Sequence, residues 1–141
     1  EMASILAESA KNQGYIPDSY VAGDSVLNGS RPFPHMIYKN MDNLNISPVT
    51  AVVKVDDTTS GIEEGLEAGC WTIGVSRYSN YMNINSLEEE KNLSSVELED
   101  RNRYAKEILN KSGAHYVVDN ITHIPNLISI INARLKNGET P

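Results

Sequence analysis

The stretch AVVKVDDTTS, residues 51–60, decides the fold class of this chain. Residues 51–55 form an apolar, β-branched run of the kind found in strands that are buried on both faces. Asp56 and Asp57 follow at once, and the polar residues after them suit the start of a helix. The stretch therefore predicts a buried strand, an acidic turn and a helix, the repeating unit of a layered α/β sheet.

The sequence after this stretch continues the same alternation. An apolar helical pattern ends at Gly69, a residue type that favours helix ends, and a strand is predicted at 71–75. Residues 76–85 are polar and predict an exposed loop. The remaining predicted elements are two helical segments that start at the capping-box spacings 86–89 and 94–97 and end at Gly113, a strand at 116–118 and an amphipathic helix over 124–135.

The sequence before the stretch is less regular. An apolar helical pattern covers residues 2–10, residues 20–22 are a weak strand candidate, and residues 23–30 are loop-like. Pro34 suits the first turn of a further helix. The predicted buried face of that helix carries Ile37, Met41 and Leu44.

Helices and strands thus alternate along the whole chain. This order predicts an α/β fold, a Rossmann-like parallel sheet flanked by helices. The length of 141 residues suits one domain, which we place at 1–136, followed by a polar tail at 137–141.

The composition excludes several classes of function. Hydrophobic residues make up 40% of the chain, and no apolar run approaches the ~18 residues needed to cross a bilayer. The net charge of −7 argues against a nucleic-acid partner, because phosphates would be repelled. Cys70 is the single cysteine, which excludes an internal disulfide and favours a reducing, cytoplasmic location. We read Cys70 as a buried packing residue.

Ligands of open parallel sheets bind beyond the carboxyl ends of the strands. The sequence places Arg31, the pair Asp56 and Asp57, and the pair Ser76 and Arg77 at such positions. A carboxylate there can hold a divalent cation, and an arginine can bind a phosphate with two hydrogen bonds. Since successive strand residues point to opposite sides, only one of the two aspartates is expected to face the site.

Simpler explanations stay open at this point. Acids near the start of a helix are favoured as caps and as partners of the helix dipole. Arg31, just before Pro32, would also be unremarkable as a surface residue.

Several runs of the chain resemble the later half of the phosphonoacetaldehyde hydrolases, the phosphonatase branch of the haloacid dehalogenase superfamily. The resemblance covers nearly the whole chain. The runs that carry it are RPFP (31–34), YKN (38–40), KVDDTTS (54–60), AGCWTIGV (68–75) and GAHY (113–116).

The resemblance implies a magnesium-dependent hydrolase that cleaves the carbon–phosphorus bond of phosphonoacetaldehyde to acetaldehyde and phosphate. In such enzymes a lysine of a cap domain forms a Schiff base with the aldehyde, and an aspartate accepts the phosphoryl group. Arg31 would match the phosphate-binding residue and Asp57 the magnesium ligand. Asp56 and Thr58 would support Asp57 from its two sides.

Two departures from the family pattern concern this acidic turn. The family usually has glycine where this chain has Asp56, and an acid where this chain has Gly61. Glu63 or Glu64 could replace the missing acid, although each is turned away by ~100° per residue on a helix. The resemblance therefore leaves magnesium binding open.

A larger departure is the lack of the nucleophile aspartate, the threonine motif and the cap domain with its lysine, so we assign no catalytic residue to this chain. The start at Glu1 matches a point just past the threonine motif. We expect the chain alone to be inactive, with a gap beside the strand predicted at 20–22. Either the missing N-terminal half or a second chain would fill the gap, or the remaining strands would pair again; a family-like homodimer is compatible with this.

Three other functions are considered. The chain could derive from a related phosphatase that acts on a small phosphate ester. It could be a pseudoenzyme that binds phosphate or a protein without turnover, which the glycine at position 61 favours. A two-component receiver domain also has an acidic pair after a strand, but here the next strand ends in Ser76 and Arg77, without a phospho-accepting aspartate.

Overall fold

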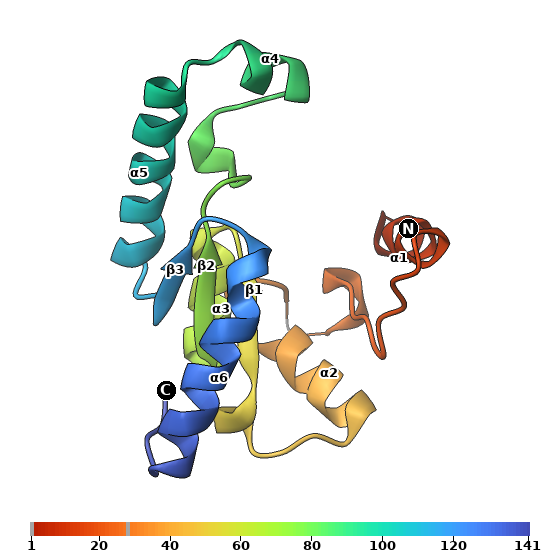
Figure 1. The fold of residues 1–141 in the computed structure, drawn as a ribbon. Helices are drawn as coiled ribbons and strands as arrows, with labels where there is room; N and C mark the ends of the chain where they lie inside the picture. The colour runs from red at the N-terminus through yellow and green to blue at the C-terminus, as the bar shows by residue number, and fades with distance from the viewer. Residues whose placement is uncertain (1, 28) are drawn as a thin grey trace.

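The computed structural model describes residues 2–27 and 29–141. Glu1, which was matched to a point just past the threonine motif, and Asn28, in the predicted loop 23–30, lie outside these residues. The described part is an α/β fold with a parallel sheet between helices (Figure 1). Its helices and strands are α1 Met2–Asn12, α2 His35–Leu44, β1 Val53–Asp56, α3 Thr59–Ala68, β2 Trp71–Val75, α4 Leu87–Asn92, α5 Ser95–Lys111, β3 Tyr116–Val118 and α6 Ile124–Lys136. Short 3-10 turns lie at Gly23–Ser25 (η1), Val49–Ala51 (η2), Asn80–Met82 (η3) and Ile121–His123 (η4).

The sheet has three parallel strands in the order β1-β2-β3. Val53 pairs with Trp71, and Ile73 pairs with Tyr116. The central strand β2 is buried along its whole length, because it has a neighbour on each side and a helix layer on each face. The predicted α/β class with a parallel sheet is confirmed.

Helices cover both faces of this sheet. Helix α6 lies over one face, where Ile131 packs with Trp71 and Ile73 (Figure 1). Helices α3 and α5 cover the other face, and the side chain of Leu109 approaches Gly74 so closely that a Cβ there would lie 3.2 Å from Leu109 Cβ. A glycine in the middle of β2 thus lets α5 pack tightly on the sheet.

The ends of the helices follow the sequence pattern. Gly69 adopts a left-handed conformation, with φ of 83°, and ends α3 as predicted. Ser94 begins α5 with a complete capping box, in which its hydroxyl accepts from the N–H of Glu97 and the Glu97 carboxylate accepts from the N–H of Ser94. Ser86 caps α4 in the same way from its hydroxyl, while the carboxylate of Glu89 bonds Asn85 instead.

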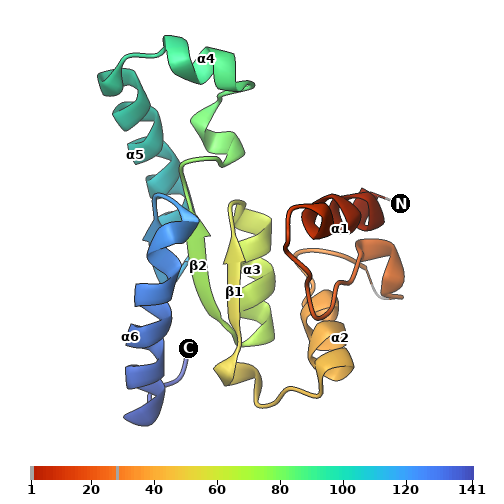
Figure 2. The same ribbon diagram turned by 45° about the vertical axis from the view of Figure 1, so that its right-hand side comes forward.

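The strand predicted at 20–22 is wrong: these residues form an extended, unpaired segment before η1. A strand needs a neighbour for its backbone groups. In the described part of the chain no strand pairs with this segment, although Val21 lines the same cavity as Val53 and Lys54 of β1. Figure 2 shows α1 and the segment after it standing apart from the sheet. Within residues 2–27 and 29–141 no strand has taken its place, so β1 is an edge strand of the described sheet.

Two further expectations need correction. The strand predicted at 51–55 begins only at Val53, after η2, and is not buried on both faces: Val55 is 37% exposed because β1 has one strand neighbour. The segment 76–85 is not fully exposed, since Ser76, Ser79 and Met82 are buried where α5 packs on η3. No helix in the described part of the chain is long and apolar enough to span a membrane.

Candidate functional site

Four charged side chains meet at the carboxyl end of β1. Arg31 comes from the bend before α2, Lys54 and Asp56 from β1, and Glu64 from α3. One oxygen of Asp56, Oδ2, lies 3.3 Å from Arg31 Nη1 and 3.2 Å from Lys54 Nζ. Lys54 Nζ also lies 2.8 Å from Glu64 Oε2. Two cations and two carboxylates therefore form one continuous network.

The other oxygen of Asp56 belongs to the start of α3. Asp56 Oδ1 accepts from the backbone N–H of Thr58 at 3.0 Å and from its hydroxyl at 2.7 Å. The Thr58 hydroxyl in turn caps α3 by accepting from the N–H of Gly61. Burial by itself would raise the pKa of Asp56, but the hydrogen bonds from Thr58 and the charge of Lys54 outweigh it and hold the pKa below its usual value. Asp56 is thus ionised at neutral pH.

Glu64 is the most deeply buried charge of this network, with its side chain 1% exposed. Its Oε2 pairs with Lys54, whereas its Oε1 is buried without a hydrogen-bond partner among the described residues. Glu64 does reach the site, but as the partner of a lysine. The sequence signal for this pair was Lys54 itself, a charged residue inside an apolar strand, which requires a buried partner.

Asp57, the predicted metal ligand, points elsewhere. Its exposed side chain has no hydrogen-bond or ion-pair partner within the described ranges, and it lines a hollow of about 360 Å³ together with Val55, Val75 and Tyr78. Arg31 lies at the same end of β1 but contacts the neighbouring Asp56. The two aspartates therefore face different surroundings, as expected from strand alternation. The phosphate role of Arg31 and the metal role of Asp57 stay predictions.

The residues at this end of the sheet make at most part of a magnesium site. Asp57 offers a free carboxylate, the ligand type that magnesium prefers. Asp56 already uses both oxygens for Thr58, Lys54 and Arg31. Across residues 2–27 and 29–141, no three acidic, histidine or cysteine side chains gather where they could hold a metal. Further ligands would have to come from outside these residues.

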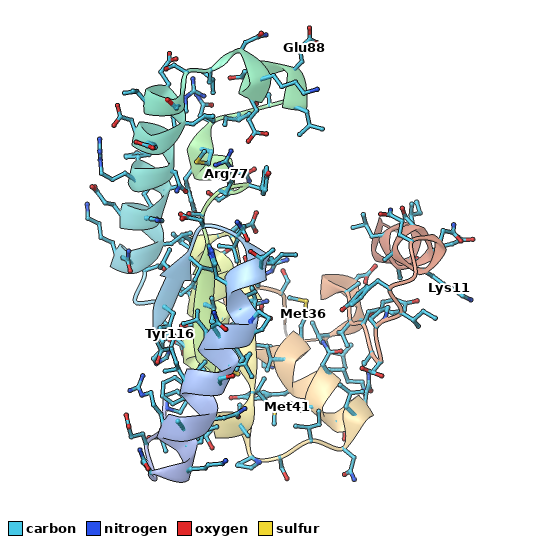
Figure 3. The ribbon with its side chains drawn as sticks, viewed as in Figure 1. Lys11, Met36, Met41, Arg77, Glu88 and Tyr116 are labelled. Carbon is cyan, nitrogen blue, oxygen red and sulfur yellow. The ribbon has the colours of Figure 1, made fainter. Side chains whose placement is uncertain are left out.

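An apolar cavity of about 320 Å³ lies between α2 and the open side of β1. Met36 and Met41 of α2, labelled in Figure 3, line it together with Val53 of β1. Arg31 and Lys54 lie on its wall as well. The cavity thus joins the ionic network to the strand edge that has no partner. An apolar surface beside an unpaired strand is a common place for a further segment to pack.

Residues just beyond the carboxyl ends of β2 and β3 form hydrogen bonds and an ion pair with α4 and α5. Ser76 donates a hydrogen bond of 2.6 Å to Asn102, whose amide donates to Asp119 at 2.6 Å. Arg77, which the sequence placed at the site and which Figure 3 labels, lies on the segment after β2. It forms an ion pair with Glu90 of α4 at 3.0 Å. These residues therefore join α4 and α5 to the sheet, away from Arg31.

Tyr81 is a contributor that the sequence analysis assigned only to a loop. Its hydroxyl accepts from the backbone N–H of Thr59 at 3.0 Å and donates to the Thr59 hydroxyl at 3.2 Å. A tyrosine 22 residues away thereby fixes the first turn of α3, next to Asp57 and Thr58. No local pattern could have revealed this contact, because it depends on how η3 folds back on α3.

Comparisons with known proteins bear directly on this site. The phosphonoacetaldehyde hydrolase of Klebsiella pneumoniae is 43% identical over 136 residues, and that of Syntrophobacter fumaroxidans is 41% identical over 140 residues. The chain is similar to one half of a phosphonoacetaldehyde hydrolase. It is covered to 96% and 99% in these comparisons but spans about half the length of each relative, 50% in both.

A solved structure agrees with this result. The phosphonoacetaldehyde hydrolase-like protein from Oleispira antarctica superposes with a TM-score of 0.89 at 42% identity, covering 96% of this chain and 48% of its own. No family model matches the chain. The resemblance to phosphonoacetaldehyde hydrolases inferred from the sequence motifs is confirmed, and it concerns half of such an enzyme.

Proposed function

We propose that this chain is the C-terminal part of a phosphonatase-like hydrolase, which cleaves phosphonoacetaldehyde to acetaldehyde and phosphate once its missing half is present. The observation that carries the proposal is Arg31 at the carboxyl end of β1, in a chain whose relatives are phosphonoacetaldehyde hydrolases. A guanidinium has five N–H donors, so the contact with Asp56 leaves donors free for a phosphonate group.

In this proposal the chain binds the phosphorus group and leaves the bond-breaking steps to the missing half. Arg31 would hold the phosphonate oxygens, while Lys54, itself paired with Glu64, holds the Asp56 carboxylate that contacts Arg31. The Schiff-base lysine and the aspartate that accepts the phosphoryl group would both come from the other half. Magnesium would supply neutralisation of the phosphoryl charge, with Asp57 as its one ligand from this chain.

The open edge of β1 is where we propose that the missing half docks. Support comes from the unpaired strand edge, the exposed Val55 and the apolar cavity between α2 and β1. A strand placed there would gain backbone hydrogen bonds to β1 and would bring its carboxyl end next to Arg31 and Asp57. A cytoplasmic location, favoured by the single cysteine, accompanies this proposal.

The test is a complementation assay. The chain is mixed with the N-terminal half of the Klebsiella pneumoniae relative, and acetaldehyde release from phosphonoacetaldehyde is measured with magnesium present. We expect no turnover by either piece alone and turnover by the mixture. Arg31→Gln is expected to lower the rate of the mixture by about 10²-fold, whereas the exposed Lys136→Gln is a matched loss of charge without effect.

Several outcomes would contradict the proposal. Turnover by the chain alone would show that it holds its own catalytic groups. Turnover of glycolaldehyde phosphate in preference to the phosphonate would identify an ester phosphatase instead. Binding of the two halves without turnover of either compound would favour the pseudoenzyme, for which the absence of an acid at position 61 is the supporting observation.

A further inference from the structure

The first turn of α3 contains a glycine, Gly61, beside which the side chain of another residue fills the space where a Cβ would lie. An ideal Cβ placed on Gly61 would lie 1.9 Å from Asp56 Cγ and 2.1 and 2.2 Å from its two carboxylate oxygens. Real Cβ atoms do not approach other heavy atoms so closely. The carboxylate of Asp56 therefore occupies the space into which a side chain at position 61 would project.

This carboxylate does more than fill space. Its side chain is 8% exposed, and its two oxygens bind the N–H and hydroxyl of Thr58, the ammonium of Lys54 and the guanidinium of Arg31. Within the described ranges, Asp56 is the one ion-pair partner of Arg31. Loss of this carboxylate would leave Arg31 without a fixed position.

The helix geometry at Gly61 requires no glycine of its own. Gly61 has no left-handed conformation, unlike Gly69, and it stands at the third position of α3, where an acidic side chain interacts favourably with the helix dipole. The reason for glycine there is the presence of Asp56. Conversely, an acid at position 61 would place its Cβ in the volume now held by the Asp56 carboxylate, and its own carboxylate directly beside that volume.

We propose that positions 56 and 61 share one carboxylate site, which this chain fills from Asp56, and that Asp56 is the positioning residue for Arg31. The acid that the chain lacks at position 61 is thus supplied from five residues earlier on the backbone. The shared site is a property of the fold alone, whereas its importance for phosphonate binding through Arg31 rests on the proposed function.

The first test is a double-mutant cycle in urea unfolding of the 141-residue chain. Asp56→Gly empties the site, and Gly61→Asp places two carboxylates in it, so each is expected to lower the folding equilibrium constant roughly tenfold or more. The reciprocal variant Asp56→Gly/Gly61→Asp is expected to recover most of the loss. Losses that simply add in the double variant would overturn the shared site.

Two control variants test whether the recovery depends on a carboxylate at position 61 and on the removal of Asp56. The first controls for helix propensity at position 61, and the second removes Asp57 in place of Asp56. Asp56→Gly/Gly61→Ala restores a helix-favouring residue without a carboxylate and is expected to recover less than the reciprocal variant. Asp57→Gly/Gly61→Asp keeps Asp56 in place and is expected to retain the full cost of Gly61→Asp. Equal recovery in either control would contradict the proposal.

The second test measures the exchange of an Arg31 guanidinium N–H with water. It needs neither substrate nor the missing half. In nuclear magnetic resonance spectra of the parent chain, the Arg31 N–H that donates to Asp56 is expected to exchange more slowly with water than the free N–H groups of the same guanidinium. Asp56→Asn keeps the shape and removes the charge, so the exchange of this N–H is expected to accelerate at least several-fold; the reciprocal variant restores the slower exchange. Unchanged exchange in Asp56→Asn would refute the positioning role, even if complementation produced an active enzyme.

Discussion

Apolar residues are buried in the strand β2 but largely exposed in the segment before α2. All five residues of β2 are buried, with a strand on each side and helices above and below. In the earlier segment, Ile5 and Leu6 are each 63% exposed, although they lie on a helix with an apolar pattern. Tyr20, which was predicted to begin a strand, is exposed as well.

The difference shows that a local pattern forms an element only where a neighbour completes it. A helix satisfies most of its backbone groups internally, so α1 is helical although Ile5 and Leu6 on it are exposed. A strand satisfies half of its backbone through other strands, so residues 20–22 remain unpaired. β1 stands between the two cases, with one paired edge and one open edge. The ionic network with Arg31 lies at that boundary.

The largest expected effect contrasts the two regions by truncating one apolar side chain in each. Trp71 is fully buried and stacks below Arg134, whose guanidinium carbon lies 4.4 Å from the centre of the ring. Trp71→Ala is expected to cost about 3–5 kcal/mol of unfolding free energy, and Leu6→Ala under about 0.5 kcal/mol. Urea unfolding followed by circular dichroism measures both. A large cost for Leu6→Ala would show that α1 is covered in solution.

A second, intermediate effect on stability concerns the ionic network at β1, through the pair of Lys54 and Glu64. Lys54→Met leaves the buried Glu64 without its cation, which is expected to cost about 3 kcal/mol because an uncompensated charge is then buried. Lys39→Met is the control, because its pair with Asp42 is exposed and is expected to contribute less than about 1 kcal/mol. Replacing Glu64 by Leu in addition to Lys54→Met should recover stability. If Lys54 and Lys39 gave equal losses, the network would be unimportant for the fold.

The smallest expected effect is a pH dependence of the unfolding free energy that arises from His115, which contacts Thr72 of β2. Burial, together with the charge of Arg134, lowers the pKa of His115 below its usual 6.5. The neutral ring accepts a hydrogen bond from the N–H of Thr72 at 3.0 Å. Because the unfolded chain binds this proton more readily, the contribution of His115 is complete above about pH 6.5 and is lost as the pH falls through the lower folded value.

Unfolding free energies at pH 7.5 and 5.5, read from the fluorescence of the single tryptophan, measure this loss. His115→Gln should remove the decline over this range. The pKa values of Asp56 and Asp119 are also lowered, so their contributions persist until the pH falls below about 4 and do not interfere. A decline that survives in His115→Gln would place the responsible group elsewhere.

Much of the fold could be predicted from the sequence because the relevant patterns are local. The strands at 71–75 and 116–118, the end of α3 at Gly69 and the start of α5 at Ser94 depend on residues that are adjacent along the chain. The candidate site was predicted less fully. Arg31 and the acidic pair were found, but the buried pair of Lys54 and Glu64 depends on how α3 packs against β1.

By itself, the sequence determined an alternating α/β chain with an acidic pair at the end of an apolar strand, and its motifs carried the likeness to phosphonoacetaldehyde hydrolases. Only the tertiary structure decided that Asp56, and not Asp57, engages Arg31, and that the Asp56 carboxylate fills the space over Gly61. The physical reason is that periodicity and capping act within a few residues. Burial and charge pairing depend on which segments, here 25 residues apart, the sheet brings together.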